Sequence, residues 1–342
     1  MLKIAAYVKL YALHNKSGGE LYLHHLIKDI MKNIECEVTI FCYDSDTPRE
    51  INDDNIIEYY DDVKIINLTK DDKTVLNNFD IILTHLDMTS QVCDYCLYKK
   101  IKCFLIIHSY LKCHTEYTKN DNIFTIYNAP LIKSEYKNTG HTNNYNCIIL
   151  PFFNFELYNK YYMYEIEDRE YITFVNPQIM KGANVVLKLA KYYPNKKFLI
   201  IEGGYYRHKQ LLKEFKALPN CHVVKPTDNM LNDVYLKSRI VLQPSDFETW
   251  GMVASEAASL GIPVLINKNS NGLTANMGKM CLGGFDSENP EYYIKYIDML
   301  DDKNIYGIYS FFMSNISEKN YNKRLEQLDL LFNNWEKIIK KK

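Results

Sequence analysis

Short apolar runs alternate with longer segments of helical period along the N-terminal half of the chain. Most of the runs are continuously apolar, as are strands that helices cover on both faces of a parallel sheet. Residues 21–34 instead place Leu23, Ile27 and Ile30 on one stripe, which predicts an amphipathic helix. The alternation predicts a doubly wound α/β domain. The predicted strands cover residues 4–8, 37–42, 63–68, 81–85, 103–108, 123–127 and 147–150.

The same alternation restarts beyond residues 158–169, a polar, tyrosine-rich segment that indicates a linker. Two tandem Rossmann-like domains are therefore expected, at 1–160 and 168–318, facing each other across a cleft where a ligand would bind. A periodic apolar pattern predicts a C-terminal helix at 319–342, which we expect to pack on the first domain. The predicted strands of the second domain cover residues 171–175, 197–202, 222–224, 240–243 and 263–266.

Composition narrows the class of protein. The 41 Lys and Arg residues balance 42 Asp and Glu, so no charge bias draws the chain to nucleic acid, and we expect no such partner. Nine Cys in 342 residues are too few for a disulfide scaffold. The apolar runs are too short to span a bilayer. We expect a soluble cytoplasmic protein, in the host cytoplasm if viral, whose basic C-terminal end makes at most peripheral membrane contact.

Tyrosine is the compositional oddity, with 29 residues. The interpretation that we favour is AT-rich coding, as in a large DNA virus, a protist or a low-GC bacterium. The alternative is a functional aromatic surface, which would require tyrosines to gather around a groove.

The segment richest in candidate chemistry is residues 244–264, with the sequence PSDFETWGMVASEAASLGIPV. A predicted strand ends before it, a loop carries Glu248 and Gly251, and a helix begins near Met252. The free N–H groups of a helix start favour an anion, and a glycine lets a ligand approach the backbone. Glu256 follows Glu248 by eight positions on an alanine-rich helix, where sugar hydroxyls would supply hydrogen-bond partners for the carboxylate.

This segment resembles the signature of retaining GT-B glycosyltransferases of family 4, the glycosyl transferases group 1. The resemblance rests on the Pro-Ser-x-x-Glu-x-x-Gly loop, the second Glu and the Gly-x-Pro-Val strand. It implies that Glu248 contacts the donor sugar near the reacting carbon and that Glu256 binds the nucleotide ribose. It also implies that the loop around Trp250, Gly251 and Met252 meets the sugar or the diphosphate. The Trp250 ring either faces the sugar or packs against the helix.

A second stretch, FVNPQIMKG at 174–182, resembles the family's strand-loop-Lys-Gly element. The resemblance implies that Lys181 binds the diphosphate, where a cation and a helix start converge on one phosphate. Asn176 departs from the family, because many members have Arg there. We expect Arg207 to supply the missing cation. A later departure is Ala275, where the family usually has Glu.

In the first half, Gly18 and Gly19 precede the predicted helix and resemble the family's N-terminal Gly-Gly loop, which approaches the donor phosphate. Two glycines alone are a weak signal. His108 ends a predicted strand and matches the family's sugar-contacting His, so we expect it in the active site. His85 also ends a strand, and we interpret it as structural.

Two metal-like patterns are set aside. The triplet at 44–46, Asp-Ser-Asp, imitates a metal-binding motif but lies far from the donor elements in sequence. Cys93 and Cys96 lack a second close-spaced pair, so structural thiols are favoured over zinc.

Taken together, the resemblance implies a metal-independent, retaining glycosyltransferase of glycan biosynthesis. It would transfer a hexose-type sugar from a UDP- or GDP-sugar to a hydroxyl of a glycan or small acceptor, with no cofactor. Glu248, His108 and Lys181 would be its catalytic residues. The alternatives are a nucleotide-sugar-binding or epimerase-like GT-B protein and a nicotinamide-dependent oxidoreductase. The latter is disfavoured because no Gly-x-Gly-x-x-Gly follows the first strand.

Overall fold

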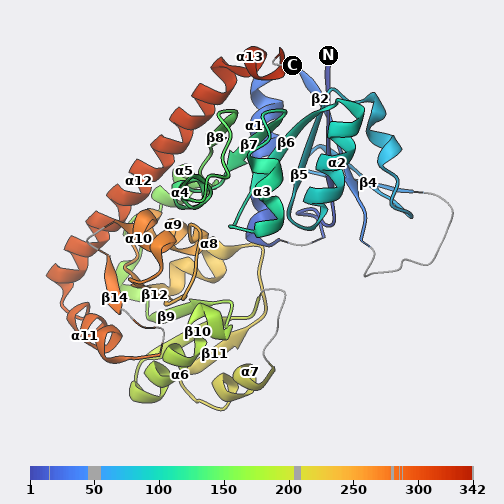
Figure 1. Ribbon diagram of the computed structural model, residues 1–342. Coiled ribbons are helices and arrows are strands. Elements are labelled where there is room, and N and C mark those ends of the chain that lie inside the picture. Colours follow the sequence, from blue (N-terminus) through green and yellow to red (C-terminus); the bar gives the residue numbers. More distant parts are fainter. Residues whose placement is uncertain are drawn as a thin grey trace. The chain divides into compact units, whose positions relative to one another are not determined.

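The computed structural model describes residues 1–14, 16–44, 55–203, 209–278, 281–284, 286 and 288–340. The chain forms two compact units (Figure 1). Unit 1 contains Met1–Phe152 together with Lys323–Lys342, and unit 2 contains Phe153–Asn322. Among the described residues, the structure has no helix that combines the length and apolar character needed to cross a membrane.

Unit 1 is built on an eight-stranded sheet of order β3-β4-β2-β1-β5-β6-β7-β8. All neighbouring strands are parallel except β3, which pairs antiparallel to β4 at the edge. The strands are β1 (Leu2–Val8), β2 (Cys36–Cys42), β3 (Ile56–Tyr60), β4 (Val63–Asn67), β5 (Ile81–His85), β6 (Lys102–Ile107), β7 (Ile123–Tyr127) and β8 (Asn146–Ile148). The helices are α1 (Gly18–Asn33), α2 (Thr89–Lys99), α3 (Thr115–Thr118) and α4 (Pro130–Asn138).

The core of unit 1 includes residues from the C-terminal end of the chain. Helix α12 (Lys303–Asn333) begins in unit 2 and continues into unit 1, where α13 (Trp335–Lys340) follows it. Leu328, Leu331 and Trp335 are buried in the same cluster as the central strands. Arg324, which is 3% exposed, donates from Nε to the carbonyl of Leu150 at 3.0 Å. This C-terminal segment is therefore an integral part of unit 1.

Unit 2 is built on a six-stranded sheet of order β11-β10-β9-β12-β13-β14, in which all pairs are parallel. The predicted class, α/β with two Rossmann-like domains, is confirmed. The strands are β9 (Tyr171–Val175), β10 (Lys197–Ile201), β11 (Cys221–Val224), β12 (Ser238–Gln243), β13 (Val264–Asn267) and β14 (Leu282–Gly284). The helices are α5 (Phe155–Asn159), α6 (Ala183–Tyr192), α7 (Lys209–Lys216), α8 (Met230–Asp233), α9 (Met252–Ser259), α10 (Asn271–Met277) and α11 (Glu291–Met299).

The segment at 158–169, interpreted from sequence as a linker, packs within unit 2. Arg169 is 1% exposed, and its guanidinium donates to the carbonyls of Tyr161 at 3.1 Å and Tyr164 at 2.8 Å. Tyr158 and Tyr161 pack against an apolar cluster of unit 2. These tyrosines of the 158–169 segment are thus anchored to the body of unit 2.

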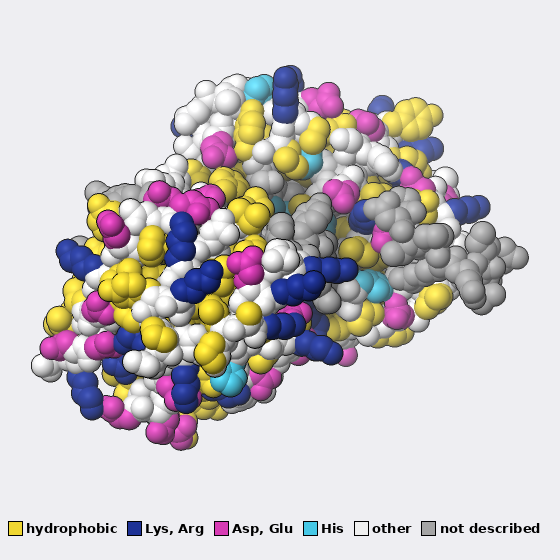
Figure 2. All heavy atoms as spheres, turned by 90° about the horizontal axis from the view of Figure 1, so that it is seen from below, with side chains coloured by type: hydrophobic (Ala, Val, Ile, Leu, Met, Phe, Trp, Pro, Cys, Tyr) yellow, Lys and Arg dark blue, Asp and Glu magenta, His cyan; other side chains and the backbone are white. Residues whose placement is uncertain are grey.

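Basic and acidic side chains are both spread over the face of the molecule shown in Figure 2. This distribution accords with the formal net charge of −1. A surface of mixed sign does not focus a strong field of one sign on a ligand.

Candidate functional site

Two loops of unit 2 meet at the carboxyl ends of the adjacent strands β9 and β12. The first loop covers residues 176–182, and the second covers residues 244–251. The N–H of Asp246, in the second loop, donates to the carbonyl of Met180, in the first, at 3.0 Å. Gly182 ends the first loop with φ of +83°, and a Cβ there would lie 2.4 Å from the carbonyl oxygen of Pro244. Both the backbone angle and the close approach therefore require glycine. The two loops form one connected structure at the carboxyl ends of the strands, where Rossmann-like sheets bind ligands.

Lys181 and Glu248 lie side by side in these loops. Lys181 Nζ is 2.5 Å from Glu248 Oε1, and the two side chains are 26% and 16% exposed. The same oxygen accepts from Gln243 Nε2 at 3.1 Å and from Ser245 Oγ at 3.3 Å. Within the described residues, no hydrogen bond to Glu248 Oε2 is recorded. The carboxylate is thus fixed by three donors through one oxygen, and the other oxygen can accept a hydrogen bond from a hydroxyl.

The backbone approaches closely around the loop that carries Glu248. Gly251 has φ of +85°, and a Cβ there would lie 2.4 Å from Leu273 Cδ2. A Cβ on Gly272, at the start of α10, would lie 1.9 Å from the carbonyl oxygen of Glu248. Gly251 is the N-cap of α9, and Met252 is its first residue. The glycines thereby hold the loop and the N–H groups of the α9 start in one place.

Glu256 is half-buried within α9, and its carboxylate contacts Tyr235. The Tyr235 hydroxyl donates to Glu256 Oε2 at 2.5 Å. Burial raises the pKa of Glu256 to about 7, and the hydrogen bond from Tyr235 opposes that rise. The carboxyl group therefore changes its charge near neutral pH.

The Trp250 side chain packs inside unit 2, with 3% of its surface exposed. Its carbonyl accepts from Asn276 Nδ2 at 2.7 Å, and the carbonyl of Gly251 accepts from the same nitrogen at 3.1 Å. Of the two sequence interpretations, packing describes the ring.

We expect Arg207 to supply the cation that is missing at Asn176, but Arg207 lies outside the described residues. Asn176 adopts φ of +63°, and its Oδ1 accepts from Gln178 Nε2 at 2.9 Å. Asn176 therefore shapes the start of the loop that carries Lys181. Ala275 is exposed on α10.

In unit 1, the first turn of α1 lies close to the ends of β5 and β6. Gly18 is the first residue of α1, and a Cβ on Gly19 would lie 3.8 Å from His108 Nε2. His108 Nε2 is 3.0 Å from His85 Nδ1, so one imidazole donates and the other accepts. The Tyr22 ring meets the His108 ring edge-on at 5.2 Å. Gly18 and Gly19, which were predicted to precede the helix, thus form its first turn beside His108. His85 is the direct partner of His108.

Acid is expected to destabilise unit 1 through these histidines. Burial lowers the pKa of His108 to about 4, with His114 adding a smaller effect, and burial holds the pKa of His85 well below its usual value. Between pH 6.5 and 4 these histidines bind protons in the unfolded chain but stay neutral in the folded chain. The free energy of unfolding therefore falls as pH falls. For His108 alone the loss reaches about 3 kcal/mol.

Chemical denaturation at pH 7.5, 6.0 and 4.5 measures this loss. The variant His85→Gln is expected to reduce the slope between pH 6.0 and 4.5, whereas His222→Gln, at an exposed position of unit 2, should leave it unchanged. An equal slope in wild type and His85→Gln would contradict the expectation.

The residues of the two metal-like patterns make other contacts where the structure describes them. Asp44 lies 3.7 Å from Lys9 Nζ, and the other two residues of that triplet lie outside the described residues. All nine cysteines are free, with Cys93 Sγ 3.8 Å from Cys103 Sγ in the core. In the part of the chain that the structure describes, no cluster of three His, Cys, Asp or Glu side chains is suited to a metal ion.

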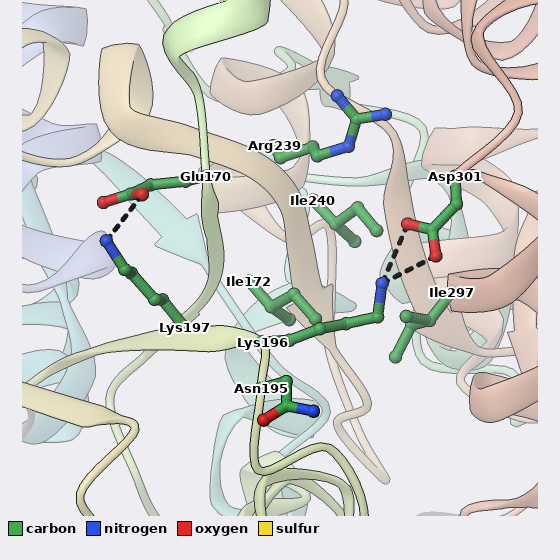
Figure 3. Close-up of a pocket in the computed structure, with 9 residues that line it drawn as sticks. All are labelled: Glu170, Ile172, Asn195, Lys196, Lys197, Arg239, Ile240, Ile297 and Asp301. Carbon is green, nitrogen blue, oxygen red and sulfur yellow. Dashed lines mark hydrogen bonds and ion pairs between the residues drawn. The ribbon is translucent and has the colours of Figure 1, made fainter.

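A cavity of about 190 Å³ lies at the opposite end of the unit 2 strands from these loops, beside the amino ends of β9, β10 and β12 (Figure 3). Lys196 contacts Asp301 at 2.7 Å, and Lys197 contacts Glu170 at 2.7 Å. Four of its charged side chains therefore pair with one another. Because ligands of such sheets bind at the carboxyl ends of the strands, we assign the candidate site to the Lys181–Glu248 loops.

Three further side chains hold the two glutamates and were not among the predicted site residues, namely Gln243, Ser245 and Tyr235. Ser245 belongs to the quoted motif, so its position beside Glu248 was a usable signal. Gln243 ends a buried strand, where a polar side chain is a sign of a site. Tyr235 carried no signal, because its contact with Glu256 spans 21 residues.

Comparison with known proteins identifies the fold. A model of the family described as glycosyl transferases group 1 matches residues 165–277. A glycosyltransferase from Rickettsia africae is 13% identical, with 100% of this chain and 99% of that chain covered and a TM-score of 0.74. HepE from Anabaena in complex with UDP-glucose is 12% identical, with coverage of 98% and 100% and a TM-score of 0.72.

Sucrose-phosphate synthase from Thermosynechococcus elongatus is 16% identical, with coverage of 99% and 96% and a TM-score of 0.69. A search of curated protein sequences gave no match. At these sequence identities, the solved structures establish the similarity of the fold alone, and they do so over nearly the whole chain. The expected resemblance is confirmed, for the fold by these structures and for residues 165–277 by the family model.

Proposed function

Residues 165–277 form a glycosyl transferases group 1 segment within a chain of GT-B fold, and on this basis we propose a retaining hexosyltransferase. It transfers a hexose-type sugar from a UDP- or GDP-sugar to an acceptor hydroxyl of a glycan or glycoconjugate. The observation that carries the proposal is the Lys181–Glu248 pair, held at the carboxyl ends of β9 and β12. The free thiols accord with the cytoplasmic location that we also propose.

The two side chains suit opposite parts of a nucleotide sugar. The Lys181 ammonium has three donors, and a diphosphate oxygen can take the place of the Glu248 contact. The N–H groups at the start of α9 provide further donors to an anion. Glu248 accepts from a sugar hydroxyl and stabilises positive charge that develops on the sugar ring in the transition state.

Retention places the incoming hydroxyl on the face from which the phosphate departs. The bond from the acceptor oxygen to the anomeric carbon forms as the bond to the phosphate oxygen breaks, and the acceptor proton passes to the departing phosphate. The protein then acts by positioning and by stabilising charge, so this mechanism requires no metal. His108, with Gly18 and Gly19, is the unit 1 group that we propose for contact with the donor.

A nucleotide-sugar-binding or epimerase-like role is the alternative, because the same groups would bind the donor without transfer. Product analysis with and without an acceptor separates these activities, since an epimerase changes the donor in both cases. UDP-glucose is the first donor to test, since HepE was solved in complex with it. Selective binding of NAD instead of UDP or GDP would favour the oxidoreductase alternative.

Transfer is expected to continue in EDTA. The wild-type protein is incubated with UDP- and GDP-hexoses and a panel of glycan acceptors, and the anomeric configuration of the product is determined by NMR. Product with the configuration of the donor, formed in the presence of EDTA, supports the proposal. Inverted product contradicts the retaining mechanism, and activity that is lost in EDTA and restored by manganese contradicts metal independence.

A further inference from the structure

Tyr235 contacts Glu256 from a position that is fixed by the core of unit 2. It begins the short 3₁₀ helix η6 (Tyr235–Lys237), which leads into β12. The residue is 0% exposed and belongs to the cluster that also contains Val241 and Ala258. The Tyr158 ring of α5 meets the Tyr235 ring at 5.9 Å. The packed Tyr235 ring therefore holds its hydroxyl in a fixed position beside Glu256.

The surroundings of Glu256 contain hydroxyls and no basic partner among the described residues. Tyr235 of η6 donates to Oε2, and Tyr158 of α5 is close enough for the carboxylate to raise its pKa, after the larger effect of burial. On α9 itself, Ser259 Oγ donates to the carbonyl of Glu256 rather than to its carboxylate. The recorded hydrogen bond to the carboxylate therefore comes from Tyr235 alone within the described chain.

This geometry divides the carboxylate into two parts. Oε2 accepts the Tyr235 hydroxyl at 2.5 Å, and Oε1 has no hydrogen bond recorded among the described residues. A carboxylate has about four lone-pair sites, so an ionised Glu256 can hold Tyr235 and still accept hydroxyls from a vicinal diol. Without the tyrosine hydroxyl, the side chain would lose the contact that fixes its orientation.

We propose that Tyr235 is a positioning residue for the nucleoside of the donor: it fixes Glu256 so that the carboxylate presents Oε1 to the ribose hydroxyls. The inference rests on the proposed function, in which Glu256 binds the ribose. It adds a second residue whose effect on donor binding passes entirely through Glu256.

Proton binding provides a readout that distinguishes positioning from structural support. Burial raises the pKa of Glu256 to about 7, while the Tyr235 hydrogen bond lowers it. Removal of the hydroxyl therefore raises the pKa further and reduces the ionised fraction at neutral pH. A protonated Glu256 has less capacity to accept from a diol. Tyr235→Phe should thus impair nucleotide binding most near pH 7 and least at pH 9.

The experiment measures the affinity of UDP and GDP by calorimetry between pH 6 and 9 for wild type, Tyr235→Phe and Tyr306→Phe. Tyr306 is the matched control, because its buried hydroxyl donates to a backbone carbonyl, that of Arg239, at 2.8 Å. We expect Tyr235→Phe to weaken nucleotide binding about tenfold at pH 7 and to raise the pH midpoint of the affinity profile. In the transfer assay, KM for the donor should change more than kcat. Tyr306→Phe is expected to lower Tm and leave the midpoint in place.

A second measurement follows the Glu256 carboxyl group directly in the free protein. Infrared titration of the carboxyl band, assigned by its loss in Glu256→Gln, should give a higher pKa in Tyr235→Phe than in wild type. If wild type binds a nucleotide but Tyr235→Phe has an unchanged pH profile, the positioning role is overturned and the proposed function stands. If wild type binds neither UDP nor GDP, the proposed function and the ribose role both fail, whatever the infrared result.

Discussion

Glu248→Gln is expected to lower the rate of sugar transfer by about 10²–10³-fold, the usual cost of removing one preorganised electrostatic contact from a transition state. Glutamine keeps the shape of the side chain but loses the negative charge. It then no longer balances Lys181, which lies 2.5 Å away, and no longer stabilises positive charge on the sugar. The measurement is kcat with the best donor identified by the transfer assay, together with Tm.

The chain offers a matched control for this charge change. Lys188 and Glu288 form another ion pair in unit 2, at 3.4 Å, with side chains 51% and 52% exposed. Glu288→Gln removes the same charge from a solvent-screened pair and is expected to leave kcat unchanged. If Glu248→Gln and Glu288→Gln gave equal rates, Glu248 would have no part in the reaction. Lys181→Met should weaken donor binding as well as lower kcat, because its charge is assigned to the diphosphate.

Gly182→Ala is expected to have the largest effect on stability of the substitutions considered. The residue has φ of +83°, and the new Cβ would lie 2.4 Å from the carbonyl oxygen of Pro244. Left-handed backbone costs an alanine about 1–2 kcal/mol, and forced overpacking adds about 1–3 kcal/mol. We therefore expect the free energy of unfolding to fall by about 3 kcal/mol, measured by chemical denaturation.

Gly140→Ala separates the two causes of that loss. Gly140 has φ of +72° at the end of α4, and a Cβ there meets no heavy atom of the described residues within 4 Å. Its expected cost is the backbone part alone, about 1 kcal/mol. Gly182→Ala should also reduce transfer activity beyond its effect on stability, because it pushes apart the loops that carry Lys181 and Glu248. Similar unfolding free energies for the two variants would show that the Pro244 contact relaxes without cost.

Most of the parallel strands were predictable from the sequence because burial on both faces leaves continuous apolar runs. The parallel strand β14 was missed, because two of its three residues are glycines and form no apolar run. Strand β3 was missed because it lies at the sheet edge, where Ile56 and Ile57 are 52% and 55% exposed, and no burial pattern marks it. The segment at 158–169 looked like a linker because of its polarity. What holds it to unit 2 is Arg169 bonded to backbone carbonyls, a kind of contact that composition does not reveal.

The residues of the candidate site were predictable where a local motif carries them, as for Lys181, Glu248 and Glu256. Their partners were not, because the partners come from other elements of the chain. His85 is the clearest case in unit 1: as a single strand-end histidine it suggested a structural role, yet it lies 3.0 Å from His108. The buried orientation of the Trp250 ring depends on tertiary packing, which the local sequence does not specify.

The division of unit 1 into two separated stretches has a consequence for the order in which the protein folds during synthesis. Residues 153–322 are contiguous, so unit 2 can complete its core as soon as they have left the ribosome. Unit 1 begins earlier but needs Leu328, Leu331 and Trp335 to cover its apolar surface. The unit that is translated first is therefore completed last, and its uncovered surface is the one at risk of aggregation until the C-terminal segment arrives.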